Sequence, residues 1–273
     1  ASLGSILAEY GRLRHRFRSL DGLVSLGGHT ALPALLGARE RSLPTFIQEQ
    51  NTVPGRTNRL FVPWALEVFL GFPVRKFRQT AKSTVTGNPV RPAGSTDEDW
   101  FQQSPLLVVL GGSQGSRQLS EILAGAASDL LEEGWAIYYV RGGNGEDLSD
   151  REWASERSFR QVEFEPQLHC ILPEANCVWS RAGAGTLSEL IQYEIPAVLF
   201  PYPLAADDHQ RSNAQWVSRH GPARVLSSED PPPAKELLDA TEALCSNEAG
   251  YEVPWDREIL PQKRIARRIQ KWI

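Results

Sequence analysis

Two short apolar runs in the second half of this chain each end in a glycine-rich turn that opens a helical pattern. The first run, over 106–110, leads into Gly-Gly-Ser-Gln-Gly-Ser at 111–116. The second, over 177–180, leads into Arg-Ala-Gly-Ala-Gly-Thr at 181–186. An apolar run followed by a tight turn and a helix is typical of a parallel sheet, because parallel neighbours need crossover connections. The repeated pattern therefore predicts an α/β fold.

The same alternation of apolar runs and helical patterns extends along most of the chain. Further strands are expected at 23–26, 45–47, 68–72, 84–86, 135–140, 161–164 and 197–200. Helices are expected at 3–20, 116–133, 186–193, 209–219 and 260–273, with one more between the triple proline at 231–233 and residue 244. Strands and helices that alternate in this way predict parallel, doubly wound sheets.

Length and local composition divide the chain into domains. A chain of 273 residues is about two domains long by the usual length prior. Residues 92–104 combine proline and glycine with the acidic run 97–99, a composition typical of a linker. We expect a first domain over 1–91, a linker over 92–104 and a second domain over 105–255. The remaining segment, 256–273, is expected to be a helix that packs back on the first domain.

Composition and charge exclude several classes of protein. Hydrophobic residues make up 41% of the chain and charged residues 23%, which excludes a disordered tail or a collagen. The formal net charge of −4 argues against a nucleic-acid binder with a basic groove. Three cysteines without Cys-x-x-Cys spacing argue against a zinc site and a disulfide framework. We therefore expect a globular protein with no metal site and no nucleic-acid partner.

The glycine turns point to an anionic ligand. Glycine lets the backbone approach a ligand closely, and the free N–H groups at a helix start attract an anion such as a diphosphate. A tight turn without a ligand is the alternative. In the second turn, Glu189 either accepts hydrogen bonds from a ribose diol or completes a capping box with Thr186. Arg181 is either a clamp on a base or one half of a surface salt bridge.

Three polar strings add to the candidate site. They are Gln-Glu-Gln-Asn at 48–51, extending to Thr-Asn at 57–58, Gly-Asn-Pro-Val-Arg at 87–91, and Asp-Asp-His-Gln at 207–210. All follow predicted strands, and open α/β sheets bind ligands where their strands end. The third string either caps a helix or binds sugar hydroxyls.

The order and spacing of these strings resemble the MurG family, bacterial N-acetylglucosaminyltransferases that convert lipid I to lipid II. The matching strings are GG at 27–28, QEQN-x-x-x-G-x-TN at 48–58, GNPVR at 87–91, GGSQGSR at 111–117, SRAGAGTLSE at 180–189 and DHQ-x-x-NA at 208–214. The resemblance covers about residues 3–273. It implies the glycosyltransferase B architecture of two Rossmann-like, doubly wound α/β domains, with an incomplete N-terminal domain in this chain.

The resemblance also implies a binding site for UDP-N-acetylglucosamine, held mainly by the C-terminal domain. Arg181 falls where the family caps the uracil, and Glu165 where a backbone group contacts it. Glu189 falls on the ribose diol and Ser113 on the diphosphate. The other donor-binding positions are Gln114 beside Ser113, Ala184, Gly185, Thr186, Leu187 and Ser188 at the helix start, the sugar-reading pair His209 and Gln210, and Asn51 and Arg91 from the N-terminal domain.

This chain departs from the family at the catalytic base. Family members begin with a strand and a glycine-rich loop whose histidine is assigned to deprotonating the acceptor hydroxyl, and this chain starts after that loop. The catalytic residue is therefore unassigned. His29 matches a later turn, where we expect a loop histidine without a catalytic role. The chain is interpreted as a fragment, as a naturally short protein with a partner that supplies the loop, or as a non-catalytic binder.

The activity implied by the resemblance is an inverting, metal-independent transfer of N-acetylglucosamine from UDP-N-acetylglucosamine to lipid I in peptidoglycan biosynthesis. No cofactor is implied. The alternative is a truncated or partner-dependent UDP-sugar-binding subunit without transfer activity of its own. Because the acceptor is a lipid pyrophosphate and segment 3–20 is basic and amphipathic, we expect an anionic membrane surface as a partner. The alternative for this segment is an ordinary domain helix. The implied location is peripheral, on the cytoplasmic face of the cell membrane.

Overall fold

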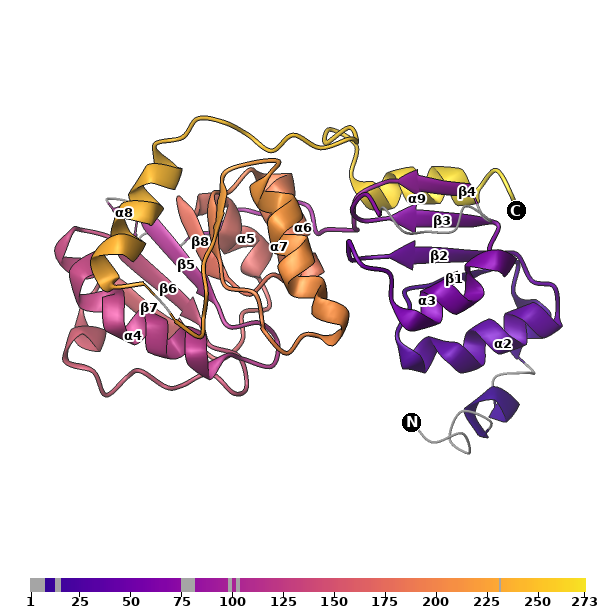
Figure 1. Cartoon of the computed structure of the whole chain (residues 1–273), viewed down its shortest axis with the longest axis horizontal. Coiled ribbons are helices and arrows are strands. Elements are labelled where there is room, and N and C mark those ends of the chain that lie inside the picture. Colours follow the sequence, from indigo (N-terminus) through magenta and orange to yellow (C-terminus); the bar gives the residue numbers. More distant parts are fainter. Residues whose placement is uncertain (1–7, 13–15, 75–81, 98–99, 102–103, 231) are drawn as a thin grey trace. The chain divides into compact units, whose positions relative to one another are not determined.

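The computed structural model describes residues 8–12, 16–74, 82–97, 100–101, 104–230 and 232–273. The chain folds into a first unit, Ala1–Val90 with Pro254–Ile273, and a second unit, Arg91–Val253. Each unit is built on one parallel β-sheet with helices packed against it (Figure 1). Of the helix expected over 3–20, residues 8–12 are helical and η1 (Arg16–Ser19) is a 3₁₀-helix, while 3–7 and 13–15 lie outside the described residues.

The first unit contains a four-stranded parallel sheet in the order β1–β2–β3–β4. Its strands are β1 (Leu23–Ser25), β2 (Thr45–Glu49), β3 (Glu67–Leu70) and β4 (Lys82–Val85). Its helices are η2 (His29–Ala31), α2 (Leu32–Glu40), α3 (Arg56–Phe61), η3 (Val62–Trp64) and α9 (Pro261–Ile269). Helices α2 and α3 lie on one face of the sheet and α9 lies on the other (Figure 1). The apolar side chains that alternate along β2 and β3 thus find a helix on each side.

Helix α9 joins the first unit although it is distant in sequence. Pro261 occupies its first turn, where a missing N–H has no cost, and Ile265 packs on the stacked rings of Phe46 and Phe69. Beside this contact, Glu67 on β3 is 1% exposed, and its Oε1 accepts hydrogen bonds from Arg268 Nε at 2.5 Å and Thr84 Oγ1 at 2.8 Å. The buried ion pair therefore fixes α9 on the sheet.

We expect Arg268→Ala to lower the free energy of unfolding by about 2–4 kcal/mol, because it leaves the buried Glu67 carboxylate without its cation. Arg267→Ala is the matched control, since Arg267 is the exposed neighbour on the same helix. Urea unfolding of both variants measures the difference. Equal stabilities of the two variants would show that the ion pair does not hold α9.

Strand β1 is the least covered part of the first unit. It pairs with β2, and within the described ranges no strand pairs with its other side. Val24 and Leu26 remain 45% and 61% exposed. Parallel sheets are normally covered on both faces, so this edge presents apolar side chains and unpaired backbone groups to solvent.

The second unit contains a six-stranded parallel sheet in the order β10–β9–β8–β5–β6–β7. Its strands are β5 (Leu106–Leu110), β6 (Ala136–Val140), β7 (Phe159–Val162), β8 (Cys177–Ser180), β9 (Ala197–Leu199) and β10 (Ala223–Val225). The chain runs outward from β5 to β7, returns to β8 beside β5, and then runs outward to β10. The sheet is therefore doubly wound, and its strand order reverses between β5 and β8.

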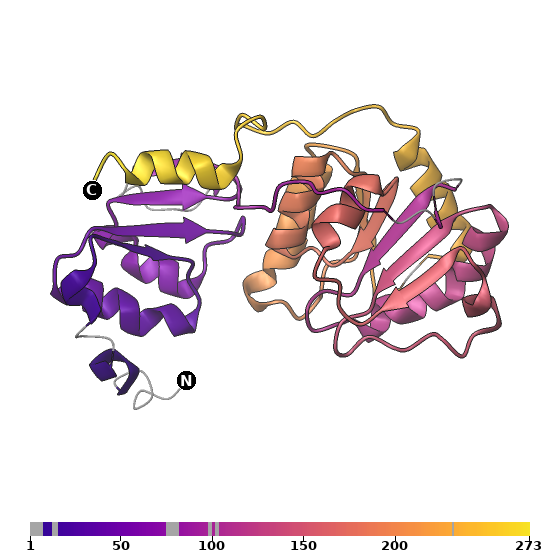
Figure 2. The ribbon, with the colours of Figure 1, turned by 180° about the vertical axis from the view of Figure 1, so that it is seen from behind.

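Helices cover both faces of this second sheet. They are α4 (Arg117–Glu132), η4 (Glu152–Ser155), α5 (Leu168–Ile171), η5 (Leu172–Glu174), α6 (Ala184–Tyr193), η6 (Ala206–Asp208), α7 (His209–Ser218) and α8 (Ala234–Cys245). Helices α4 and α8 share one face (Figure 1). They enclose a core that includes Trp179 and Phe200. Helices α6 and α7 lie on the opposite face (Figures 1 and 2).

The predicted α/β class with two parallel sheets is confirmed, and the second sheet has the reversal of strand order that marks a doubly wound sheet. The strands expected at 106–110 and 177–180 agree with β5 and β8 residue for residue. Strand β10 was not predicted, because its three residues are only partly buried and carry no apolar run. Residues 92–97 form neither helix nor strand, and 98–99 and 102–103 lie outside the described residues.

Candidate functional site

The candidate site of the second unit lies where the strand order of its sheet reverses. Strands β5 and β8 are parallel neighbours, and both glycine turns follow their carboxyl ends. A cavity of about 930 Å³ opens there. Its lining residues are 110–118, Asn144, Arg181, Gly183, Gly185, Thr186, Tyr202, Pro203, Leu204, Gln210 and Glu229. A crevice at this point is the general ligand site of open α/β sheets.

The first glycine turn is locked to the loop that follows β6. Gly112 and Gly115 have φ values of +82° and +79°, which favour glycine. A Cβ on Gly115 would lie 2.3 Å from the backbone nitrogen of Gly145, and one on Gly142 would lie 2.2 Å from the carbonyl oxygen of Gly112. Asn144 N also donates to the carbonyl oxygen of Gln114 at 2.7 Å. Two glycine-rich loops therefore interlock, and neither tolerates a side chain at these contacts.

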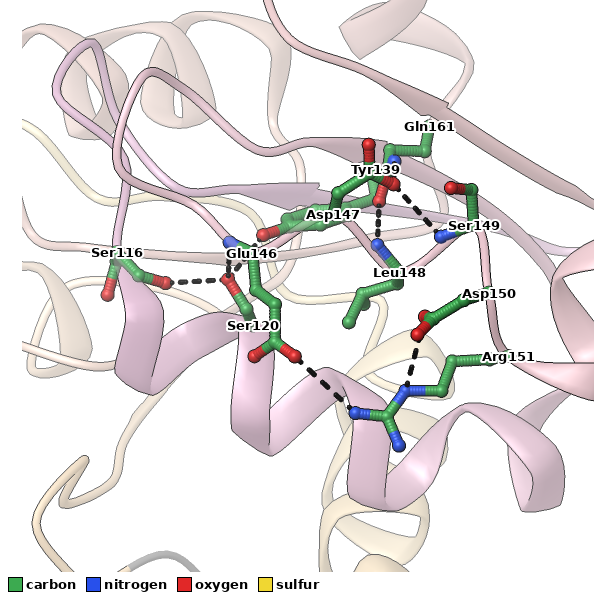
Figure 3. A network of polar contacts seen from close by, with 10 residues as sticks. All are labelled: Ser116, Ser120, Tyr139, Glu146, Asp147, Leu148, Ser149, Asp150, Arg151 and Gln161. Atoms are coloured by element: carbon green, nitrogen blue, oxygen red, sulfur yellow. Dashed lines mark hydrogen bonds and ion pairs between the residues drawn. The ribbon is translucent and has the colours of Figure 1, made fainter.

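A buried hydroxyl network fixes the helix start behind this turn (Figure 3). Ser120 Oγ donates to the carbonyl oxygen of Ser116 at 2.9 Å and contacts Tyr139 Oη at 2.5 Å. The same oxygen accepts a hydrogen bond from Glu146 N at 2.9 Å. In the adjoining loop, hydrogen bonds from Ser149 and Gln161 lower the pKa of Asp147 to about 2 (Figure 3). The loop after β6 thus hydrogen-bonds to the start of α4 and stabilises the glycine turn that precedes this helix.

Arg181, at the end of β8, makes five hydrogen bonds around the cavity. Its guanidinium donates twice to Ser116 Oγ, at 3.0 and 2.7 Å, and once to Gln118 Oε1 at 2.7 Å. It also donates to Ser228 Oγ at 2.8 Å and to the carbonyl oxygen of Phe200 at 3.1 Å. Every acceptor is neutral, so the surface-salt-bridge alternative is wrong. The half-buried positive charge is left for a ligand anion to balance.

Burial lowers the pKa of Arg181 from its usual value, and the guanidinium nevertheless stays charged at neutral pH. The ring of Tyr202 lies with its centroid 5.6 Å from the guanidinium carbon, on the cavity side. The family role implied for Arg181 is a cap on the uracil. Its guanidinium already donates to acceptors of the protein, so Arg181 would interact with a ligand through its charge and by stacking.

The second glycine turn opens helix α6 without a side-chain cap. The helix begins at Ala184, with Gly183 at the N-cap position and no side-chain cap hydrogen bond. Thr186 is therefore inside the first turn, and the capping-box alternative for Thr186 and Glu189 is wrong. Gly183, Gly185 and Thr186 line the cavity, so the N–H groups of this turn are placed to meet an anion.

Glu189 lies one turn further along α6 and is half-buried. Burial raises the pKa of its carboxyl group, and the neighbouring Arg91 acts in the opposite direction. Arg91 Nη1 donates to the carbonyl oxygen of Pro166 at 2.7 Å, and Tyr193 Oη donates to the carbonyl oxygen of Arg91 at 2.9 Å. A second cluster therefore surrounds Glu189, within the second unit and distinct from the residues that line the cavity.

Glu165 belongs to this second unit as well. Its Oε2 accepts a hydrogen bond from Tyr138 Oη at 2.6 Å, and its Oε1 accepts one from Gln167 N at 2.7 Å. Both carboxylate oxygens of Glu165 therefore accept hydrogen bonds from the protein. The preceding side chain, Phe164, is 72% exposed two residues after β7 ends.

The structure brings together part of the predicted site. Six predicted residues line one cavity: Ser113, Gln114, Arg181, Gly185, Thr186 and Gln210. Ala184, Leu187 and Ser188 are buried inside α6, and Ser188 Oγ donates to the carbonyl oxygen of Ala184 at 2.7 Å. His209 begins α7 without lining the cavity, whereas Gln210 Oε1 accepts a hydrogen bond from Tyr202 N at 2.9 Å.

Asn51 lies in the first unit, next to a buried carboxylate. Glu49 is 2% exposed and accepts hydrogen bonds from Asn51 N at 2.9 Å, Gly55 N at 2.9 Å and Asn58 Nδ2 at 2.8 Å. The string at 48–58 is therefore folded around Glu49. His29 is exposed at the start of η2.

Several lining residues were not predicted, namely Ser116, Gln118, Asn144, Tyr202 and Glu229. Ser116 caps α4, accepting a hydrogen bond from Leu119 N at 3.2 Å, and a serine after a glycine turn is a recognisable cap signal. The other four follow different strands and carry no local pattern that could have marked them.

Comparisons with known proteins agree with this architecture. Residues 106–267 match the model of the glycosyltransferase family 28 C-terminal domain, and residues 18–70 match that of its N-terminal domain. The chain belongs to glycosyltransferase family 28. This membership bears out the MurG resemblance, because the curated relatives carry the name of the UDP-N-acetylglucosamine–N-acetylmuramyl-(pentapeptide) pyrophosphoryl-undecaprenol N-acetylglucosamine transferase.

Two such relatives come from Synechococcus. The protein of strain CC9902 is 33% identical over 255 residues, covering 91% of this chain and 70% of the relative. That of strain WH7803 is 36% identical over 222 residues, covering 79% of this chain and 61% of the relative. A third, from Nostoc, is 32% identical over 84% of this chain and 66% of its own length. The family 28 chain thus spans about two thirds of the length of these relatives.

Solved structures share the fold. Acinetobacter baumannii MurG has a TM-score of 0.69 at 23% identity, covering 99% of this chain and 81% of that one. Staphylococcus aureus MnaA, solved with UDP, has a TM-score of 0.70 at 15% identity, covering 100% and 82%. At these identities the similarity shows that this family 28 chain shares the fold of the two proteins.

We expect Glu189→Gln to weaken binding of UDP-N-acetylglucosamine at neutral pH by about 10-fold or more, because the ligand loses a hydrogen bond to a charged acceptor. Affinity of the unsubstituted chain should also fall as the pH is lowered from about 7.5 towards 5, because protonation removes the acceptor and the Glu189 pKa is raised. Calorimetry over this range measures both effects.

Glu174→Gln, at an exposed glutamate, is the control, and this variant should bind the ligand with the pH dependence of the unsubstituted chain. UDP-N-acetylglucosamine is used as the ligand in place of UDP, because the terminal phosphate of UDP itself titrates near pH 6. Because the pKa of the Glu189 carboxyl group is raised in the folded chain, protonation of this group stabilises the folded state. Titration of Glu189 therefore does not unfold the chain as the pH falls. An unchanged pH profile in Glu189→Gln would remove Glu189 from the site.

Proposed function

We propose that this chain carries the donor-binding part of a transferase that moves N-acetylglucosamine from UDP-N-acetylglucosamine to lipid I. The names of its relatives supply the reaction. The observation that carries the proposal is the charge of Arg181, which has only neutral acceptors and lines the same cavity as the glycine turn before α4 and the uncapped N-terminus of α6. A diphosphate supplies the missing negative charge, and the helix N–H groups supply its hydrogen bonds.

The same arrangement supports the leaving group of the transfer. When an acceptor hydroxyl attacks the anomeric carbon, negative charge develops on the departing UDP. Preorganised N–H groups and a fixed guanidinium stabilise that charge without having to reorganise. The attacking hydroxyl also needs a base. Of the histidines in the described residues, none lines the cavity, so residues 1–273 by themselves are expected to bind the donor well and to transfer slowly.

Calorimetry with UDP and UDP-N-acetylglucosamine is the primary test. We expect micromolar to submillimolar binding, and we expect Arg181→Met to weaken it by about 10- to 100-fold because the ligand loses its fixed cation. Arg224→Met, at an exposed arginine of the same sheet, is the control. Absence of heat at millimolar ligand would remove the donor site and the proposed function with it.

The second candidate function is a UDP-sugar-binding subunit that needs a partner for transfer. It is favoured by the lining of the cavity, in which no histidine of the described residues stands to act as the base. Turnover of a lipid I analogue separates the candidates. Donor binding with turnover lowered by about 10²–10⁴-fold against a full-length relative supports the subunit, and full turnover supports the complete transferase.

Sugar selectivity should depend on Gln210. It lines the cavity, and its Oε1 accepts a hydrogen bond from Tyr202 N, so its Nε2 is the group that it offers to a ligand. We expect Gln210→Ala to reduce the preference for UDP-N-acetylglucosamine over UDP-N-acetylgalactosamine, because a hydroxyl-reading group is lost. Gln215→Ala on the same helix is the control. An unchanged ratio of the two dissociation constants would assign Gln210 to holding Tyr202.

The proposed location is the cytoplasmic face of the cell membrane, where the lipid acceptor is reached by a peripheral protein. No helix within the described residues is long and apolar enough to cross a bilayer. On the first unit, Leu60 and Trp64 are 56% and 43% exposed beside the exposed Arg59. Apolar side chains flanked by arginine are typical of a surface that binds anionic lipid.

We expect the chain to co-sediment with vesicles containing anionic phospholipid and to release at high salt. Leu60→Ser with Trp64→Ser should reduce the bound fraction several-fold, whereas Val24→Ser, at an exposed apolar side chain of β1, should not. Binding that is equal on neutral vesicles would contradict the electrostatic part of the proposal.

A further inference from the structure

Two cysteines from distant parts of the sequence meet in the second unit, away from the donor cavity. Cys177 begins β8 and is fully buried, and Cys245 is the exposed last residue of α8. The thiol of Cys245 lies 3.3 Å from the carbonyl oxygen of Asn176, the residue directly before Cys177. Because Asn176 and Cys177 are adjacent in the chain, the exposed thiol of Cys245 lies beside the buried Cys177.

The packing of α8 keeps this contact in place. Trp179 Nε1, on β8, donates to Thr241 Oγ1, on α8, at 3.0 Å, and both side chains are fully buried. Leu237 of the same helix joins the core that contains Trp179. Helix α8 therefore packs directly against β8, and its last residue, Cys245, lies beside the start of that strand.

The two thiols differ in reactivity. The hydrogen bond from Cys177 lowers the pKa of the Cys245 thiol, while burial raises the pKa of Cys177. Glu242, one turn before Cys245, opposes the first shift. A thiolate is the nucleophile in thiol–disulfide exchange, so the accessible Cys245 reacts first with an oxidant from solvent. Cys177, which is buried away from solvent, is placed to attack the mixed disulfide formed on Cys245.

We propose that Cys177 and Cys245 are an oxidisable pair that forms an intrachain disulfide. The thiolate of Cys245 attacks one sulfur of a small-molecule disulfide and releases the other half as a thiol after protonation. Cys177 then loses its proton, attacks the sulfur of Cys245 and displaces the second thiol. Two cysteine thiols lose two electrons and two protons, and the small-molecule disulfide is reduced to two thiols.

The bond would join the end of α8 to the start of β8. Neither residue lines the donor cavity, so the modification leaves nucleotide binding intact and acts on the stability of the second unit. A disulfide that closes a long loop restricts the unfolded chain, which favours the folded state. The inference is thus independent of the proposed transferase activity.

The experiment treats the native 273-residue chain with glutathione disulfide, quenches in acid, alkylates in denaturant and maps peptides by mass spectrometry. We expect a peptide pair joining Cys177 to Cys245, two hydrogens lighter than its reduced components, and a melting temperature that rises and returns on reduction. Cys170, half-buried with its thiol 3.6 Å from His169 Nε2, is the internal control and should be alkylated.

Cys245→Ser should abolish both the joined peptide and the rise in melting temperature, and Cys170→Ser should abolish neither. A glutathione adduct that persists on Cys245 would overturn the proposal, because it means that Cys177 cannot reach the mixed disulfide. Joined peptides that contain Cys170 in place of Cys177 would also overturn it. UDP affinity, measured on the oxidised chain, reports on the donor site separately.

Discussion

The hydrogen bonds of Arg181 hold the donor cavity of the second unit together. One guanidinium at the end of β8 reaches the N-cap of α4, the end of β9 and the segment after β10. These elements are separated in sequence. The planar guanidinium of arginine can satisfy several acceptors in fixed directions, which the single ammonium of lysine cannot. Arg181 thus adds side-chain hydrogen bonds to the pairing of β5 with β8, which already sets the two glycine turns side by side.

The electrostatic character of the cavity follows from the same residue. The acceptors of Arg181 are hydroxyl, amide and carbonyl oxygens, so its charge is solvated by the protein but not neutralised. Two helix starts add partial positive charge at the same edge of the sheet. Glu189, with its raised pKa, stands one turn away on α6, beside Arg91 and Tyr193. The cavity itself is therefore the positive region, which suits an anionic ligand, whereas Glu189 lies outside its lining.

Both glycine turns and their strands could be predicted from local sequence, because an apolar run, glycines and a helical pattern are adjacent in the chain. Two features were harder to predict, the first residue of α6 and the strand β10. The Thr-x-x-Glu spacing of Thr186 and Glu189 suggested a cap, yet α6 begins two residues earlier, at Ala184. Periodicity places a helix but rarely its first residue, since the cap depends on backbone geometry. The short strand β10 was not predicted, because edge strands carry weak apolar patterns.

The sequence by itself determined the α/β class, the two glycine turns and the family, since each rests on residues that are close together or in fixed order. The tertiary structure decided which side chains share a cavity. Ser116, Gln118, Tyr202 and Ser228 surround Arg181 only because the strand order reverses between β5 and β8. It also decided which charges are buried, as for Glu49 and Glu67, because desolvation depends on packing from distant segments such as α9. Contacts of this kind have no local signature, so they become visible only in the folded chain.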